Sequence, residues 1–381
     1  MAVTSKKFPH KLLSLLDKRK VSTNFRKLSL PDSKLIDFSS NDYLGFSKNP
    51  ELKKLKENIV KQYKLKQEGS TGARLISGNS SLAEQTEKQI AKFHHAETAL
   101  LFNSGYDANT GLLSSVPQKR DLVLYDELCH SSIIDGVRQS FADSFKFRHN
   151  DLQHLQRLLE RNNHAETIYV VTESVFSMDG DCAVLKKIAA LCKKQNAFLI
   201  VDEAHATGVF GKEGRGLCNE EGIEKDCFAR IYTFGKALGT HGAVVVGSKD
   251  LQNYLINFAR SFIYTTALPP ASIASVAAAY NLLQKNKSQS VLEKNIKLFN
   301  KLTSSFSGKI ASQSAIHCFL VPGNENAIKA SEKLIKKGFD VRAIKSPTVK
   351  EGSERLRICL HATNTEEEIK KLAKELAAIF L

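Results

Sequence analysis

The chain has 381 residues, of which 42% are hydrophobic and 25% charged, a balance typical of a soluble globular protein with roughly two to three domain-sized units. It contains no run of about 18 apolar residues that could cross a membrane, and its basic N-terminus lacks the apolar core of a signal peptide. The seven cysteines form no Cys-x-x-Cys pair, which argues against a disulfide framework or a zinc site and favours a reducing, cytoplasmic location.

The formal net charge is +15. Such an excess can attract nucleic acid, an anionic membrane surface, or acidic small molecules and carrier proteins. The lysines are spread along helical stretches such as 51–67, with few aromatic residues between them. This pattern is typical of solvated helix faces, and electrostatic attraction of a polyanionic substrate is the alternative.

From about residue 98, short runs rich in apolar and β-branched residues alternate with helical patterns. The candidate strands are 98–102, 121–126, 167–174, 197–205, 229–234 and 242–248. Apolar strands that alternate with helices indicate a mostly parallel sheet buried on both faces. The sequence therefore predicts an α/β fold with helices flanking a central sheet.

The pattern changes after a helical segment at 271–286. Residues 287–381 contain two short strand candidates, each followed by an amphipathic helix, which predicts a smaller C-terminal α+β domain. We expect 46–286 to form the large domain and residues 1–45 to be an N-terminal segment that packs on the small domain.

Polar residues follow several of the predicted strands. In an open α/β sheet, ligands bind at the carboxyl ends of the strands, so these residues are candidates for one site. They are Ser104, Gly105, Tyr106, His130, Ser177, Asp202, His205, Thr233 and Lys236.

Asp202 ends an apolar run, which would place a carboxylate at the tip of a buried strand. It could cap a helix or form a salt bridge, or it could face a cationic heterocycle nitrogen. In the second case His205, three residues further on, could orient that group or bond to a ring substituent.

Lys236 follows another strand, within the stretch TFGKALGTHG. A phosphate-binding P-loop needs Ser or Thr after the lysine, but Ala237 follows here, and the Gly-Lys pair in 211–213 also fails the pattern. Two alternatives remain, a surface lysine and a lysine that forms a Schiff base. The second needs a pocket that lowers the pKa of the amine and small neighbours that admit an aldehyde, and Gly235 and Gly239 provide room.

The stretch SGYDANTG at 104–111 joins a predicted strand to a predicted helix. Free backbone N–H groups and the dipole at a helix start favour an anion such as phosphate. The alternative is an ordinary turn between a strand and a helix.

A series of motifs runs in uninterrupted order from about Asp37 to the C-terminus: FSSNDYLG, GSTGARLISGN, DELCHSSIIDG, TESVFSMDGD, VDEAHATGVFGKEGRG and TFGKALGTHGA. This series resembles that of the α-oxoamine synthases, which are fold-type I enzymes dependent on pyridoxal 5'-phosphate (PLP). The resemblance implies a PLP-dependent transferase that works as a homodimer with shared active sites.

The resemblance also implies roles for the cofactor-binding residues. Lys236 would bind the cofactor covalently and later move the substrate Cα proton. Asp202 would pair with the protonated pyridine nitrogen and keep the ring an effective electron sink. His130 would stack on the pyridine face, with His205 and Ser177 near the ring's 3-oxygen.

Phosphate and substrate contacts are implied in the same way. Gly105, Tyr106 and Thr233 would hold the phosphate, and Thr266 would reach over from the partner subunit. The substrate-binding residues would be Arg357 for the amino-acid carboxylate, Asn41 beside it, and Thr348 and Arg26.

The implied reaction is the decarboxylative condensation of an amino acid with an acyl thioester of CoA or acyl carrier protein. Segments 263–270 and 346–362 look most like the family member that joins a pimeloyl thioester to L-alanine in biotin synthesis. Members that use glycine with acetyl-CoA, serine with palmitoyl-CoA, or succinyl-CoA are the alternatives.

A protein of a different class, a basic nucleic-acid-binding or nucleotide-hydrolysing protein, would also suit the charge and the Gly-Lys pairs. The sequence lacks a P-loop, aromatic-rich basic patches and zinc-ligand spacing, which argues against it.

Overall fold

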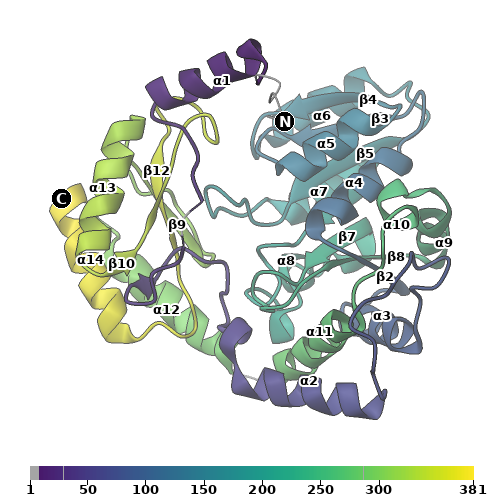
Figure 1. Ribbon diagram of the computed structural model, residues 1–381. Coiled ribbons are helices and arrows are strands. Elements are labelled where there is room, and N and C mark those ends of the chain that lie inside the picture. Colours follow the sequence, from purple (N-terminus) through teal and green to yellow (C-terminus); the bar gives the residue numbers. More distant parts are fainter. Residues whose placement is uncertain (1–7, 29, 286) are drawn as a thin grey trace, which may run out of the picture.

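The computed structural model describes residues 8–28, 30–285 and 287–381, and the large domain is built on a seven-stranded sheet (Figure 1). The strand order is β2-β8-β7-β6-β5-β3-β4. The strands are β2 (Thr98–Phe102), β3 (Leu122–Asp126), β4 (Asp143–Phe147), β5 (Ile168–Glu173), β6 (Phe198–Asp202), β7 (Cys227–Thr233) and β8 (Ala243–Gly247). All neighbouring strands from β4 to β7 are parallel, and β8 runs antiparallel to both of its neighbours. The predicted, mostly parallel sheet is confirmed.

Helices cover both faces of this sheet. They are α2 (Pro50–Gln62), α3 (Ser81–Phe93), α4 (Gly105–Ser115), α5 (Ser131–Gln139), α6 (Leu152–Arg161), α7 (Leu185–Lys194), α8 (Leu217–Glu220), α9 (Lys249–Phe258), α10 (Arg260–Ile263) and α11 (Pro270–Leu283), with short 3-10 turns at Phe46–Lys48, Lys212–Gly214 and Glu224–Asp226. Successive residues of β6 alternate between two cores. Ile200 packs with α4 and α5, whereas Leu199 and Val201 pack with α6 and α7. The continuous apolar runs in the sequence follow from this burial on both faces.

The C-terminal part forms a smaller body around a three-stranded antiparallel sheet of order β11-β12-β9. Its elements are α12 (Ser288–Leu302), β9 (Ile316–Leu320), α13 (Asn324–Lys336), β10 (Phe339–Asp340), β11 (Arg342–Ile344), β12 (Arg355–Cys359) and α14 (Glu366–Phe380). The sequence indicated only two of these strands. The strands β10 and β11 have two and three residues, too few for an alternating pattern to emerge.

The edge strand β4 was also missed. Its pattern DSFKF leaves the first four positions exposed and only Phe147 buried, so it lacks the apolar character of the central strands. Pairing with β3 along one side fixes it as a strand.

The N-terminal segment contacts the small domain. After helix α1 (His10–Val21), strand β1 (Ile36–Asp37) pairs in parallel with β10, and the N–H of Cys359 donates to the carbonyl of Phe38 at 2.8 Å. We propose the division 1–45, 46–286 and 287–381 as the domain organisation, which these contacts support; residue 286 itself lies outside the described residues.

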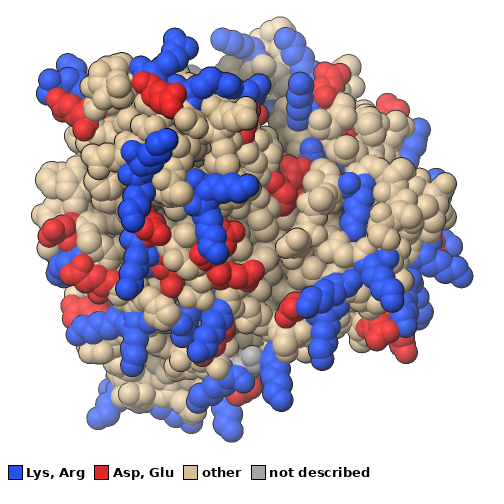
Figure 2. All heavy atoms as spheres, turned by 180° about the vertical axis from the view of Figure 1, so that it is seen from behind, with Lys and Arg blue, Asp and Glu red and all other residues tan. Residues whose placement is uncertain are grey.

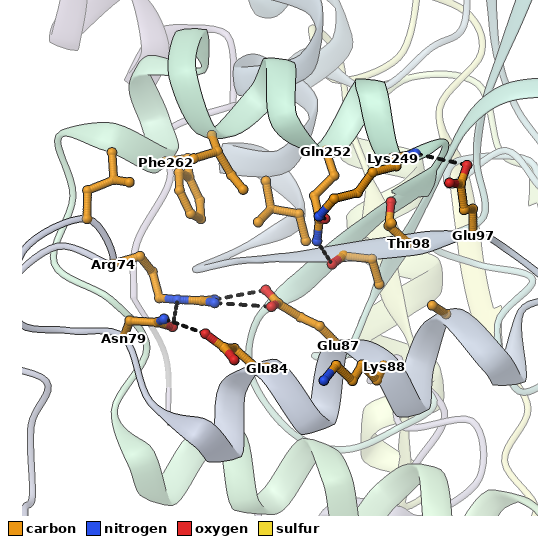
Figure 3. Close-up of a pocket in the computed structure, with 15 residues that line it drawn as sticks. Arg74, Asn79, Glu84, Glu87, Lys88, Glu97, Thr98, Lys249, Gln252 and Phe262 are labelled. Atoms are coloured by element: carbon orange, nitrogen blue, oxygen red, sulfur yellow. Dashed lines mark hydrogen bonds and ion pairs between the residues drawn. The ribbon is translucent and has the colours of Figure 1, made fainter.

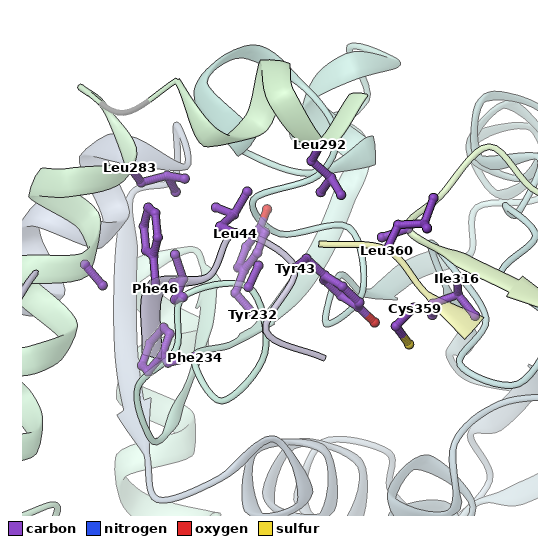
Figure 4. Close-up of a cluster of buried hydrophobic side chains, with 14 of the residues drawn as sticks. Tyr43, Leu44, Phe46, Tyr232, Phe234, Leu283, Leu292, Ile316, Cys359 and Leu360 are labelled. Carbon is purple, nitrogen blue, oxygen red and sulfur yellow. The ribbon is translucent and has the colours of Figure 1, made fainter. Parts of the chain in front are cut away.

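One hydrophobic cluster extends from the large sheet through the N-terminal segment into the small domain (Figure 4). Tyr43 of the N-terminal segment and Phe46, at the start of the large domain, are fully buried in it. On one side lie Tyr232 and Phe234, at the end of β7, and on the other lies Leu360, just after β12. The two domains and the N-terminal segment therefore share one core, which fixes the position of β12 relative to the large sheet.

A loop that follows β5 makes the second junction between the domains. Small-domain side chains donate to three of its carbonyls: Arg357 Nε to Ser177 at 2.8 Å, Cys318 Sγ to Met178 at 3.1 Å, and Ser314 Oγ to Gly180 at 2.8 Å. Gly180 has a φ of +78°, and a Cβ there would lie 2.2 Å from the carbonyl oxygen of Ile316. Only glycine permits this close approach.

His149 holds the same loop to the large domain. Its Nδ1 lies 3.0 Å from Asp126 Oδ1 at the end of β3, and its Nε2 lies 2.8 Å from Asp181 Oδ2 in the loop. Burial alone would lower the pKa of His149, but the two carboxylates raise it to about 10. The imidazolium therefore bridges both carboxylates at neutral pH.

The basic residues on the face shown in Figure 2 are not gathered into one patch. Figure 2 shows lysines and arginines scattered over one face, with acidic residues between them. This distribution supports the interpretation of solvated helix faces. Among the described helices, none combines the length and the apolar character needed to cross a bilayer.

Candidate active site

Three parallel strands end side by side at one edge of the large sheet and carry polar side chains there. Glu173 of β5 is in register with Asp202 of β6, and Asp202 is in register with Ile231 of β7, two residues before Thr233. Glu173, Asp202 and Thr233 are all buried. The strand ends thus place titratable and hydroxyl groups together at the edge where ligands bind in open α/β sheets.

The amine of Lys236 contacts an imidazole at this edge. Lys236 Nζ lies 2.8 Å from His205 Nε2. Burial lowers the pKa of Lys236 to about 8, against the charges of Asp202 and Glu173, which raise it. Burial also lowers the pKa of His205 well below its ordinary value, and the charges of Lys236 and Arg357 lower it further. His205 is therefore neutral, and Lys236 has a substantial neutral fraction near pH 7, as a nucleophilic amine requires. These properties argue against the alternative of a simple surface lysine.

The carboxylate of Asp202 is held by two donors. Asn109 Nδ2 donates to Oδ2 at 2.7 Å, and the N–H of Ala204 donates to Oδ1 at 2.9 Å. Within the described parts of the chain, Asp202 forms no ion pair, and no helix begins at it. The two structural alternatives for this residue therefore fail, and its orientation leaves a fixed negative charge at the strand end.

His130 caps α5 beside the same strand ends. Its ring Nδ1 lies 2.7 Å from Ser132 Oγ. The backbone N–H of His130 donates to Glu173 Oε1 at 2.5 Å. Loss of water around the ring lowers the pKa of His130, although Asp202 opposes this. An exposed, neutral ring with a fixed orientation can stack on a flat ligand.

Glu173 is a site residue that sequence reasoning missed. Its side chain is only 2% exposed, and burial, together with the charge of Asp202, raises the pKa of Glu173 to about 8. Glu173 is therefore largely protonated at neutral pH. The sequence signal for it is a glutamate at the end of a predicted strand, four residues before Ser177.

An anion cradle lies at the start of α4. The side chain of the capping residue Ser104 accepts from the N–H of Asp107 at 3.1 Å. The first N–H groups of a helix have no acceptor within it, and among the described residues nothing accepts from those of Gly105 and Tyr106. A Cβ on Gly105 would lie 3.5 Å from Thr233 Oγ1. Gly105, Tyr106 and Thr233 therefore converge on one place suited to phosphate.

Arg357 enters from the small domain. Its Nη2 donates to Asn41 Oδ1 at 3.0 Å, its Nε donates to the Ser177 carbonyl, and its Nη1 lies 3.0 Å from Cys359 Sγ. Asn41 in turn accepts from the hydroxyl of Tyr43 at 3.1 Å. The structure thus brings the predicted Arg357, Asn41 and Ser177 together.

Arg26 and Thr348 form a separate pair. Arg26 Nη2 donates to Thr348 Oγ1 at 3.1 Å, and both residues line a pocket of about 210 Å³ between the N-terminal segment and the small domain. No contact between this pair and Lys236 is seen in the described chain. Their substrate-binding role stays a prediction.

Thr266 also lies apart from the other site residues of its own chain. Its carbonyl accepts from Asn103 Nδ2 at 2.8 Å, and its side chain is exposed. No contact joins it to Lys236 or Asp202 within the described residues. Its predicted role in a partner's site stays a prediction.

A groove of about 500 Å³ lies elsewhere on the large domain (Figure 3). Arg74, from the GSTGARLISGN motif, makes a bidentate pair with Glu87 across it, at 2.8 and 3.1 Å. None of the predicted site residues lines this groove. The candidate active site is therefore the strand-end cluster around Lys236.

The residues of that cluster fit PLP. A helix start with free N–H groups and a neighbouring threonine suits its phosphate, a fixed carboxylate suits its pyridine nitrogen, and a buried amine of lowered pKa suits its aldehyde. These three groups converge at one sheet edge.

Comparison with known proteins agrees with this geometry. The family model for aminotransferase class I and II matches residues 33–376. The 8-amino-7-oxononanoate synthase of Emericella nidulans is 41% identical over 377 residues, which cover 92% of this chain and 91% of that enzyme.

Two solved structures show the same fold. That of 8-amino-7-oxononanoate synthase from Francisella tularensis superposes with a TM-score of 0.78 at 32% identity, covering 91% of this chain and 98% of that one. That of serine palmitoyltransferase from Sphingomonas wittichii superposes with a TM-score of 0.89 at 27% identity, covering 98% of each chain. The predicted fold and family are confirmed: the chain belongs to the aminotransferase class I and II family, and within it to the α-oxoamine synthases.

Proposed function

We propose that this chain is a PLP-dependent acyltransferase that condenses L-alanine with a pimeloyl thioester, of CoA or of an acyl carrier protein. The products are 8-amino-7-oxononanoate, CO₂ and the free thiol, so the reaction belongs to biotin synthesis. The observation that carries the proposal is the Lys236 amine, which lies 2.8 Å from a neutral His205 beside a fixed carboxylate and an arginine. The names of relatives at about 40% identity over most of the chain support alanine and pimeloyl thioester as the substrates.

Bound PLP supplies an electron sink that makes loss of the substrate Cα proton and of the carboxyl group feasible. Lys236 would hold the cofactor aldehyde and would carry the substrate Cα proton, because its lowered pKa permits both the neutral and the protonated amine near pH 7. The Asp202 carboxylate would face the pyridine nitrogen, with its direction fixed by Asn109. His130 would hold the flat face of the cofactor, and His205 and Ser177 would hold the oxygen substituent on its ring.

Arg357 is suited to the amino-acid carboxylate. A guanidinium has five N–H groups in a planar fork, and three atoms of this chain occupy one each: Asn41 Oδ1, the Ser177 carbonyl oxygen and Cys359 Sγ. Within the described residues the Tyr43 hydroxyl also interacts with Arg357, and the rest of the fork is available for a carboxylate. Its bonds to Asn41 and Ser177 orient the fork, so less conformational entropy is lost when substrate binds.

A second candidate is serine palmitoyltransferase activity. The structure of Sphingomonas wittichii serine palmitoyltransferase superposes more closely than that of the Francisella tularensis synthase. Its sequence identity of 27% is, however, well below the 41% of the Emericella nidulans synthase.

Substrate choice is tested by release of labelled CO₂ from carboxyl-labelled alanine, glycine and serine, each paired with pimeloyl-, acetyl- and palmitoyl-CoA. We expect alanine with pimeloyl-CoA to give the highest kcat/KM, by at least about tenfold, a difference of about 1.4 kcal/mol in transition-state binding. The Lys236→Ala variant is the background control. A preference for glycine with acetyl-CoA, or for serine with palmitoyl-CoA, would replace the proposal with the corresponding alternative.

The pH dependence of cofactor capture tests Lys236. The pKa of Lys236 is lowered to about 8, so the reactive neutral amine is abundant above pH 8 and its fraction falls about tenfold for each pH unit below. We expect the rate of covalent PLP attachment, followed by visible absorbance, to level off near pH 8, whereas a lysine analogue in solution continues to rise towards pH 10.

Two variants test whether Lys236 supplies the amine that PLP binds. Lys236→Ala should leave no PLP fixed to the protein after borohydride reduction, and Lys212→Ala, at the other Gly-Lys pair, should behave as wild type. A rate that climbs through pH 10 in the wild-type protein, or PLP fixed to Lys236→Ala, contradicts the assignment.

We also propose that the enzyme is a homodimer with shared active sites. The backbone N–H of Ala267 donates to Gly72 at 3.0 Å, so the GSTGARLISGN motif and the segment of Thr266 lie side by side. Large apolar side chains around this junction are exposed: Leu75 by 53%, Ile76 by 86% and Tyr264 by 73%. A second copy that covers this surface would bury it, and this supports a role for Thr266 in the partner's site.

Mixed dimers test this arrangement. Lys236→Ala and Thr266→Asp should each be inactive, since the second places a negative charge beside the partner's phosphate. Co-expressed, they should recover about a quarter of wild-type activity, because about half of the dimers then hold one intact site of two. If Thr266 instead acts within its own chain, the mixed dimers should recover no activity. That result would refute shared sites.

The free state of all seven cysteines supports a cytosolic location, where thiols stay reduced.

A further inference from the structure

Tyr43 links two parts of the candidate active site. Its ring is fully buried in the hydrophobic cluster shared by the two domains (Figure 4). Its hydroxyl oxygen lies 2.7 Å from His205 Nδ1 and 3.1 Å from Asn41 Oδ1. A continuous hydrogen-bonded chain therefore runs from Lys236 through His205, Tyr43 and Asn41 to Arg357.

The direction of each bond in this chain follows from where protons are available. Arg357 can only donate, so the atom of Asn41 that faces it is the amide oxygen, which can only accept. The same oxygen faces the Tyr43 hydroxyl. A hydrogen bond can form between them only if the hydroxyl is the donor. Burial raises the pKa of Tyr43 far above its ordinary value, so the hydroxyl keeps this proton at any working pH.

The remaining bonds are then fixed. Since the single Tyr43 proton points to Asn41, the hydroxyl oxygen must accept from His205 Nδ1. His205 is neutral and has one ring proton, so its Nε2 is bare and accepts from Lys236 Nζ at 2.8 Å. The opposite tautomer would leave the contact between Tyr43 and Asn41 without a proton. One arrangement alone satisfies every contact.

We propose that Tyr43 is a positioning residue that holds the proton of neutral His205 on Nδ1 and so presents a bare Nε2 to Lys236. Through Asn41 it also ties this tautomer to Arg357, which enters from the other domain. The effect on turnover rests on the proposed function, whereas the tautomer is a property of the cofactor-free chain. Without Tyr43, the His205 ring loses the partner that selects its tautomer and its orientation.

The first measurement needs neither cofactor nor substrate. Full-length protein labelled with ¹⁵N-histidine is studied by NMR without PLP, and the His205 signals are identified by their absence in His205→Gln. In the wild-type protein, Nδ1 should appear protonated and Nε2 unprotonated. In Tyr43→Phe, which removes only the hydroxyl, the two tautomers should both be populated.

Tyr280→Phe is the matched control. Tyr280 is equally buried in the same hydrophobic cluster, and its hydroxyl lies 3.0 Å from Nε2 of another buried histidine, His94. The two variants thus lose the same kind of bond. Tyr280→Phe should leave the His205 signals and turnover unchanged, and its melting temperature reports the structural cost of such a loss.

In the PLP-loaded enzyme, Tyr43→Phe should lower kcat by at least about tenfold, since a misoriented or wrongly protonated histidine costs turnover rather than binding. The KM for the amino acid should change by less than about threefold. An unchanged His205 tautomer in Tyr43→Phe overturns the proposal, and so does an equal fall in kcat in both tyrosine variants. Failure of the proposed function would appear separately, as a wild-type protein that has the expected tautomer but catalyses no condensation.

Discussion

The contact between the Lys236 amine and the neutral imidazole of His205 is the constraint on which the rest of the site depends. An amine that must bind an aldehyde and then carry a proton needs a pKa near neutrality, and burial at the end of β7 provides it. The same burial would be costly for a charged partner, so the neighbouring histidine is neutral. Glu173, at the neighbouring strand end, has a pKa raised by burial and by the charge of Asp202.

The site is complete only where the two domains meet. The large sheet supplies the strand ends, but Arg357 comes from β12, and Asn41 and Tyr43 come from the N-terminal segment. The shared hydrophobic cluster and the bonds to the loop at 177–180 hold these parts together. The stability of this junction therefore determines the geometry of the site, because a shift of β12 would move Arg357 away from Lys236.

Much of this could be predicted from the sequence. The apolar runs before Asp202 and Thr233 are buried on both faces, and such strands are readily recognised, so the residues at their ends were found together. Glu173 and Tyr43 were missed because their roles arise from tertiary contacts, a register across two strands and a hydrogen bond between residues 162 positions apart. Strand β4 was missed because an exposed edge strand carries little hydrophobic signal.

Lys236 and Arg357, from different domains, are proposed to act on one substrate molecule. The most direct test is a spectral titration of the PLP-loaded wild-type protein and of Arg357→Ala with L-alanine, alongside their PLP affinities. In Arg357→Ala we expect the Kd for alanine to rise by at least about tenfold, or about 1.4 kcal/mol, while PLP affinity stays as in wild type. An equal loss of both affinities, or an unchanged Kd for alanine, would contradict this proposal.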